Sequence, residues 1–154
     1  MGRVCVELSI SSIVYLVFIF IFGFWFGYDI LVAYPLEWLA ALLVGILFAF
    51  GLGIIFSVVT LVAPNMKSII RILFLPLYLM SGVIFPLWIV PDKYLPWLLW
   101  NPFAHLISNI REGVFTHYPG INGVTWSYPI EITLITLCIA MGLYRLRRQR
   151  LLVK

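Results

Sequence analysis

Residues 35–62 read PLEWLAALLVGILFAFGLGIIFSVVTLV, and the one charged side chain among them, Glu37, stands in the first turn. An α-helix rises about 1.5 Å per residue, so about 20 apolar residues cross the hydrocarbon core of a bilayer. Pro35 suits the first turn of a helix, where a backbone N–H has no intrahelical partner. Pro64-Asn65 predicts a tight turn after it, with Asn65 as the N-cap of the next helix. The stretch therefore predicts a membrane-spanning helix over 35–62.

The composition of the whole chain agrees with a membrane protein. Of its 154 residues, 64% are hydrophobic and 10% are charged, against about 25% charged in a soluble domain. A soluble domain of this size has too small a core to bury so much apolar surface. Further charge-poor runs predict spans over 8–28, 68–90 and, more weakly, 126–145. The predicted fold class is an all-α integral membrane protein with four transmembrane helices.

The basic residues predict the orientation of these spans. Cytoplasmic loops of membrane proteins carry an excess of Lys and Arg. Arg3 precedes the first span, Lys67 and Arg71 follow the second, and residues 29–37 contain neither type. The net charge is +4, and five cations crowd the C-terminal tail: Arg145, Arg147, Arg148, Arg150 and Lys154. We expect both termini in the cytoplasm and the tail on anionic membrane lipid, with no nucleic acid as a partner.

Two stripes of small residues predict close helix packing. Gly23 and Gly27 form a GxxxG match in the first span, which chance also explains because glycine is common in spans. Gly45, Ala49 and Gly53 repeat every four residues in the second span and are the stronger signal. Small side chains let helix backbones approach closely in a membrane. For the second stripe, a surface that faces a substrate is the alternative interpretation.

Prolines predict irregularity in the third span. Pro76 lacks a backbone N–H, so it removes one helical hydrogen bond and predicts a kink. Gly82 and Pro86 weaken the outer end of the span, and we expect the helix to break near Pro86.

The outer segment 92–116 is too apolar for an ordinary loop and too broken to span. Apolar segments that are too short to span are typical of re-entrant or interfacial helices. We expect two such short helices before the last span. Asn101-Pro102 predicts the start of the second, with a capping side chain followed by proline. At 100° per residue, its polar residues form one narrow stripe: Asn101, His105, Ser108, Asn109 and Glu112. The stripe faces either a water-filled path or the extracytoplasmic water.

Aromatic residues gather in the same segment, among them Trp97 and Trp100. Most fit the aromatic belt at a membrane interface, and the alternative is a set of flat faces over which sugar rings slide. His105 has no second ligand at a recognised spacing, and the two cysteines have none either, so we expect no metal site. No cofactor is expected.

Several catalytic motifs are absent from the sequence. It contains no GxxxxGK[ST], HExxH or GxSxG pattern, which bind phosphate, zinc or an acyl group in other proteins. No pair of carboxylates lies inside a predicted span. We therefore expect a protein that is not an enzyme and that would need an ATP-hydrolysing partner for any energy-driven process.

Short motifs in a fixed order resemble a known family. They are Ser81-Gly82-Val83-Ile84-Phe85-Pro86-Leu87, then Pro91, then Leu98-Leu99-Trp100-Asn101-Pro102 with His105, and later Arg111-Glu112. In this order they resemble the type-2 ABC transporter permeases, above all those that export capsular polysaccharide and O-antigen across the bacterial inner membrane. The resemblance runs over nearly the whole chain and is densest over residues 75–118.

The resemblance implies an assembly and a site. Such permeases have six spans, and two copies form a pore with two ATPase subunits, so a second copy and a separate ATP-binding subunit are the implied partners, with a polysaccharide as substrate. It also implies that residues 92–100 and 102–116 are the two short outer helices. Because Met1 falls just before what would be the family's third span, the chain is expected to be the C-terminal part of a permease, either a truncated gene product or a partial chain.

The implied substrate path contains Trp97, Trp100, Asn101, His105 and Ser108. Two alternatives from other classes stay open. One is a four-span assembly or regulatory protein that transports nothing. The other, an intramembrane enzyme acting on lipid-linked sugars, has no catalytic pair to support it.

Overall fold

The computed structural model of the protein describes residues 10, 13–14, 17, 20–21 and 32–151, with side chains to residue 146. The chain divides into two units, Met1–Val32 and Ala33–Lys154. In the first unit the described residues from 10 to 20 are helical. Most of the predicted span over 8–28, with Gly23 and Gly27, lies outside the described residues. All elements named below belong to the second unit.

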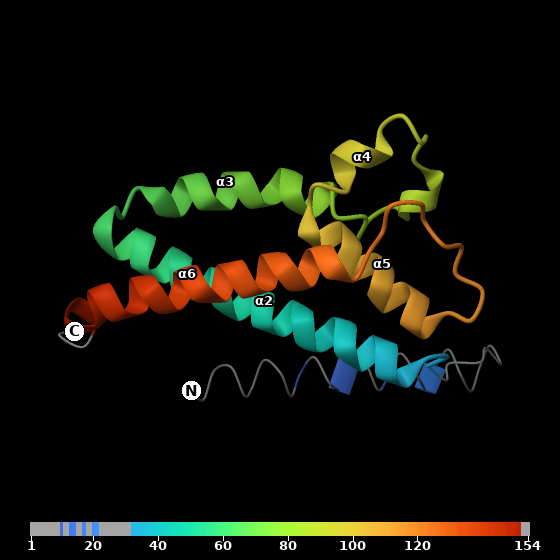
Figure 1. Cartoon of the computed structure of the whole chain (residues 1–154), viewed down its shortest axis with the longest axis horizontal. Helices are drawn as coiled ribbons and strands as arrows, with labels where there is room; N and C mark the ends of the chain where they lie inside the picture. The colour runs from blue at the N-terminus through green and yellow to red at the C-terminus, as the bar shows by residue number, and fades with distance from the viewer. Residues whose placement is uncertain (1–9, 11–12, 15–16, 18–19, 22–31, 152–154) are drawn as a thin grey trace. The chain divides into compact units, whose positions relative to one another are not determined.

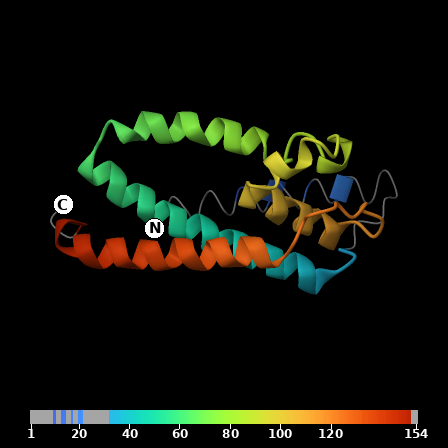
Figure 2. The same ribbon diagram turned by 45° about the horizontal axis from the view of Figure 1, so that its top comes forward.

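Two long helices dominate the second unit. α2 spans Pro35–Val62, the same bounds that the sequence predicts, and α6 spans Ser127–Leu151, which begins one residue after the predicted span and continues beyond residue 145. Both α2 and the segment Ser127–Leu146 are long and apolar enough to cross a membrane. They run side by side in Figures 1 and 2 and pack directly on each other.

The buried face of α2 holds Ala41, Phe48, Gly51 and Val58. A Cβ atom on Gly51 would lie 3.0 Å from Cγ2 of Thr136 on α6, so the two helices approach closely there. The Thr136 hydroxyl donates to the Ile132 carbonyl of its own helix at 2.7 Å. An intrahelical bond of this kind lets threonine enter an apolar contact without an unpaired polar atom.

The predicted stripe Gly45, Ala49 and Gly53 is not this contact. Ala49 is exposed, and a Cβ atom on Gly45 or Gly53 would meet no atom within 4 Å. The buried residues of α2 repeat at intervals of seven and three. They therefore lie on a face of the helix next to that of the stripe. A packing role for the stripe stays a prediction, and so does the alternative of a surface that faces a substrate.

α3 spans Met66–Leu79, so within the predicted span over 68–90 the helix ends earlier than the break expected near Pro86. Asn65 occupies the N-cap position but makes no capping hydrogen bond with its side chain. The helix ends seven residues before Pro86, because Gly82 turns the chain with a φ of 78°, a conformation that favours glycine. Pro86 instead precedes a short 3-10 helix, η2, at Leu87–Ile89. Pro76 lies inside α3, and its kink stays a prediction.

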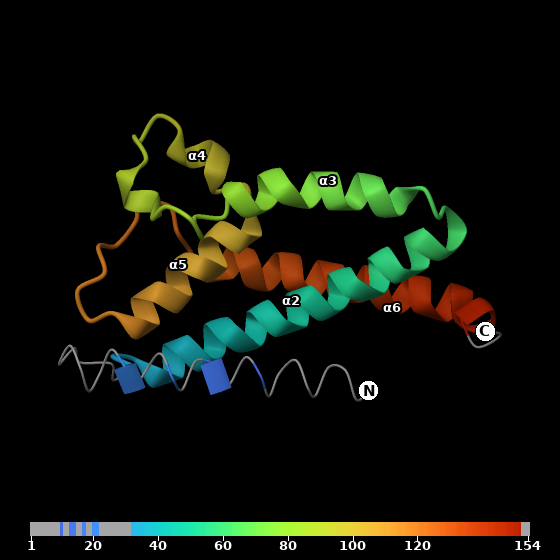
Figure 3. The same cartoon turned by 180° about the vertical axis from the view of Figure 1, so that it is seen from behind.

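α3 runs back from the turn that ends α2 (Figure 3) and buries none of its residues. Aromatic side chains form part of its contact with the other helices. The Phe74 ring lies 5.4 Å from the Phe56 ring of α2 and 6.5 Å from the Phe103 ring of α5, centroid to centroid. Phe103 in turn lies 5.1 Å from Phe48 of α2. Three helices thus meet along one row of phenylalanines.

The outer segment contains the two short helices that the sequence predicts, α4 at Leu95–Leu98 and α5 at Pro102–Val114. A small core of Leu87, Leu95 and Ala104 joins η2, α4 and α5. The far end of α5 touches the start of α2. There the Tyr34 N–H donates to the Gly113 carbonyl at 2.9 Å, and a Cβ on Gly113 would lie 2.8 Å from the Trp38 nitrogen.

Candidate functional site

Asn101 connects the start of α5 to the end of α3. Its Oδ1 accepts from the Phe103 N–H at 3.1 Å, which confirms the predicted cap. Its Nδ2 donates to the Leu77 carbonyl at 2.7 Å, one of the carbonyls at the C-terminal end of α3 that have no intrahelical donor. Asn101 is 4% exposed. Both polar atoms of its side chain are therefore paired inside the protein, and it serves as a clamp between two helices.

Most of the polar stripe of α5 is buried, so the alternative in which it lies open to the extracytoplasmic water is wrong, whereas a position beside a water-filled path stays a prediction. Asn101, His105, Ser108 and Asn109 are all buried, whereas Glu112 at its end is exposed. The physical reason is that the broken outer segment leaves backbone groups that no helix ladder pairs. Such groups need partners when they are removed from water, and the stripe supplies several of them.

His105 pairs two of these backbone groups. Its Nδ1 accepts from the Thr125 N–H at 3.1 Å, and its Nε2 lies 2.9 Å from the Leu99 carbonyl oxygen. A carbonyl can only accept, so the proton of the neutral ring is assigned to Nε2. The ring also lies 4.9 Å from the Tyr128 ring, centroid to centroid. His105 thereby holds the end of α4 and the loop before α6 against α5.

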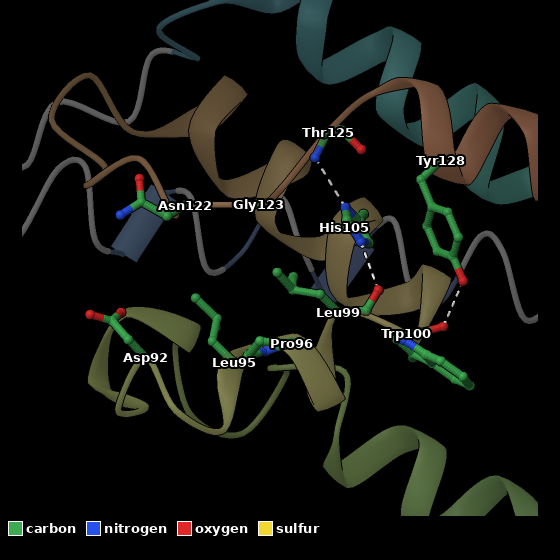
Figure 4. Close-up of a pocket in the computed structure, with 10 residues that line it drawn as sticks. All are labelled: Asp92, Leu95, Pro96, Leu99, Trp100, His105, Asn122, Gly123, Thr125 and Tyr128. Atoms are coloured by element: carbon green, nitrogen blue, oxygen red, sulfur yellow. Dashed lines mark hydrogen bonds between the residues drawn. The ribbon is translucent and has the colours of Figure 1, made fainter.

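A pocket of about 590 Å³ opens beside His105, between α4 and the loop that leads into α6 (Figure 4). In Figure 4, Asp92, Leu95 and Pro96 come from one side and Asn122, Gly123 and Thr125 from the other. Tyr128 reaches across, and its hydroxyl donates to the Trp100 carbonyl at 2.8 Å. Gly123 has a φ of 92°, and a Cβ there would lie 2.8 Å from Leu99 Cδ1, so glycine keeps this wall of the pocket in place.

The structure brings together only part of the predicted substrate path. Trp100 and His105 line the pocket, whereas Trp97, Asn101 and Ser108 do not. Trp97 belongs to the single turn of α4 and is 72% exposed. The sequence reasoning missed four polar lining residues: Asp92, Asn122, Thr125 and Tyr128. They stand in loops or at a helix start, where no periodic pattern identifies a facing side chain.

The pocket is polar on one side and aromatic on the other. In the part of the chain that the structure describes, the side chains of Asp92 and Asn122 make no hydrogen bond or ion pair, and both are exposed. Trp100 is 81% exposed. No Lys or Arg is among the lining residues that the structure describes. Across the described ranges no group of three His, Cys, Asp or Glu side chains is placed to hold a metal ion.

Similarity to known proteins identifies the family of the chain. The model of the ABC-2 type transporter family matches residues 1–115. This chain belongs to the ABC-2 type transporter family. Two curated relatives, both called polysialic acid transport protein KpsM and both from Escherichia coli, are 40% identical to it over 107 residues. The matched part is 70% of this chain and 41% of each relative.

Membership of the ABC-2 type transporter family, together with the two long apolar helices, makes the chain a helical membrane protein. The resemblance to type-2 ABC permeases that the sequence motifs indicate is thereby confirmed. The chain spans about two-fifths of the length of the curated relatives that it matches.

Proposed function

We propose that this protein is a permease subunit of an ABC exporter that moves a capsular polysaccharide, O-antigen or similar surface glycan across the bacterial inner membrane. The observation that carries the proposal is the 40% identity over 107 residues to two polysialic acid transport proteins. It is a transport subunit and no enzyme. ATP hydrolysis is assigned to a separate ATP-binding subunit, since the sequence holds no Walker-A pattern.

The proposed membrane topology has four spans with both termini in the cytoplasm. α2 and α6 would be the second and fourth spans, and their lengths and composition support this. The basic residues Lys67 and Arg71, which follow α2, favour a cytoplasmic position for that turn. The segment of α4 and α5 would then lie on the outer side as a re-entrant or interfacial piece. The basic tail would rest on anionic lipid.

A second copy of the permease would complete the path for the polymer. α3 supports this part of the proposal, because a 14-residue apolar helix that buries none of its residues has a face available for another helix. Within the path, Trp100 and His105 are the residues that the structure gathers at one pocket. Neither the family match nor the described structure favours the alternative of a four-span protein that transports nothing.

Deleting the gene for this chain in its own host tests the proposal. The surface glycan should disappear while glycan accumulates in the cytoplasm, and a plasmid copy of the gene should restore export. Detergent extracts should also yield a stable complex with a subunit that carries a Walker-A motif. If the deletion strain displayed normal surface glycan, the proposed function would be wrong.

A further inference from the structure

The loop over residues 116–126, which leads from α5 into α6, has few polar contacts with the helices before it. The turn bonds inside the loop join residues three apart in the sequence. In the described part of the chain, one hydrogen bond ties this loop to α4 or α5, from the Thr125 N–H to Nδ1 of His105 at 3.1 Å (Figure 4). Asn122, Gly123 and Thr125 line the pocket, so a single ring nitrogen holds this wall of the pocket by hydrogen bonding.

The two backbone partners of His105 determine which ring nitrogen carries the proton. Nε2 lies 2.9 Å from the Leu99 carbonyl oxygen, which can only accept, so Nε2 donates. The Thr125 N–H can only donate, so Nδ1 must present its lone pair. Both bonds exist together only in the neutral ring with its proton on Nε2. His105 is 3% exposed, so inside the protein no bulk water replaces either partner.

A proton added to the ring would act differently on the two bonds. In the imidazolium both nitrogens are donors, so Nδ1–H would point at the Thr125 N–H and that bond would be lost. The bond from Nε2 to the Leu99 carbonyl would become charge-assisted and therefore stronger. Histidine is the side chain whose charge ordinarily changes between pH 5 and 8. Acid should therefore loosen the loop while α4 stays attached to α5.

The other titratable groups around the ring do not oppose this change. Asp92, from the loop before α4, and Tyr128, from α6, line the same pocket as His105. Between pH 5 and 8 a carboxyl group is ordinarily negative and a tyrosine neutral, and a negative charge nearby favours the imidazolium. Five further charged or histidine side chains of the neighbouring segments are not among the described lining residues: Lys93, Arg111, Glu112, His117 and Glu131.

We propose that protonation of His105 releases residues 122–126 from α5, so that acid opens this wall of the pocket. The release is local, because Ile121 still packs on the small apolar core that joins η2, α4 and α5, and that contact does not depend on pH. Since the held loop requires the neutral ring, lower pH shifts the equilibrium toward the released loop. The inference does not rest on the proposed function, although the proposed topology places this loop on the outer side of the membrane.

Amide hydrogen exchange at Thr125 tests the proposal in the full chain, labelled with ¹⁵N in threonine, leucine and histidine and held in detergent micelles. Each exchange rate is divided into the rate of an unstructured amide at the same pH, which gives a protection factor. The protection factor of Thr125 should fall about tenfold between pH 8 and pH 5. The fall should have the same midpoint as the ¹⁵N titration of the His105 ring. The Leu99 amide, which donates to the Leu95 carbonyl at 3.0 Å, should keep its protection.

Two variants show whether His105 is the group that titrates. His105→Gln offers a neutral donor and acceptor, so the protection of Thr125 should be the same at both pH values. His117→Gln, the matched control, removes the other histidine of the chain, which is exposed, and should keep the pH dependence.

Several results would overturn the proposal. They are equal protection of Thr125 at pH 5 and pH 8 in the wild type, a midpoint that differs from that of the His105 ring, and a fall at Leu99 as large as that at Thr125. A pH dependence that persists in His105→Gln, or that His117→Gln abolishes, would overturn it as well. If His105→Gln leaves Thr125 unprotected throughout, the shared midpoint in the wild type decides.

Discussion

The side-chain amide of Asn101 donates to the carbonyl oxygen of Leu77 at 2.7 Å and so joins the first residue before α5 to the last turn of α3. The same side chain caps α5 through its oxygen. One side chain thus supplies hydrogen-bond partners to the backbone at two helix ends. These backbone groups therefore need no water molecule as a partner in an apolar setting.

Asn101→Ala removes both bonds and should lower the free energy of unfolding by about 2 kcal/mol, about half from the lost cap and half from the unpaired carbonyl. Asn101→Ser keeps an acceptor for the cap but is too short to reach Leu77, so its loss should be intermediate. Thermal unfolding in detergent checks the order. Equal losses for both variants would show that the cap contributes nothing, and an Asn101→Ser variant as stable as the wild type would show that the Leu77 bond contributes nothing.

His105→Ala should release the loop that precedes α6. It leaves the Thr125 N–H and the Leu99 carbonyl without their partner, at a cost of about 2 kcal/mol. Hydrogen exchange of the Thr125 amide should become faster. The Tyr94 amide, which bonds to the Pro91 carbonyl, should keep its rate and serves as the control. An unchanged rate at Thr125 would refute the role assigned to His105.

Gly113 and Gly45 give a matched pair for helix contacts. Gly113→Ala should cost roughly 1–3 kcal/mol, because its Cβ would lie 2.8 Å from the backbone nitrogen of Trp38. Gly45→Ala has open space around it and should raise the stability of the isolated chain by roughly 0.5–1 kcal/mol. Unfolding of the two variants in the same detergent compares them. A destabilised Gly45→Ala variant would instead favour the predicted packing role of the small-residue stripe.

The sequence predicted the helix ends that are set by residues close by in the chain. α2 begins at Pro35 and ends just before Pro64, and its apolar run needs no tertiary partner to be recognised. The start of α5 is equally local, because Asn101 and Pro102 are a cap and a first-turn residue in succession. These features depend on neighbours within one helical turn.

The sequence did not predict features that depend on distant partners. The apolar pattern continues past Leu79, yet α3 ends there, and the turn that follows is held by Arg111 from 28 residues away. The polar stripe of α5 is buried because its partners, such as Thr125, come from loops that have no periodic signal. Trp97 and Trp100 are alike in sequence context, and only the three-dimensional arrangement distinguishes the pocket residue.

Transport in inside-out membrane vesicles tests the proposed function most directly. Vesicles from host cells, supplied with the host's own radiolabelled surface glycan, should accumulate it in their lumen when ATP is added. Vesicles from the deletion strain should accumulate none, and the restored gene should recover uptake. If ATP-dependent uptake were the same with and without this chain, the chain would not be the permease of that exporter.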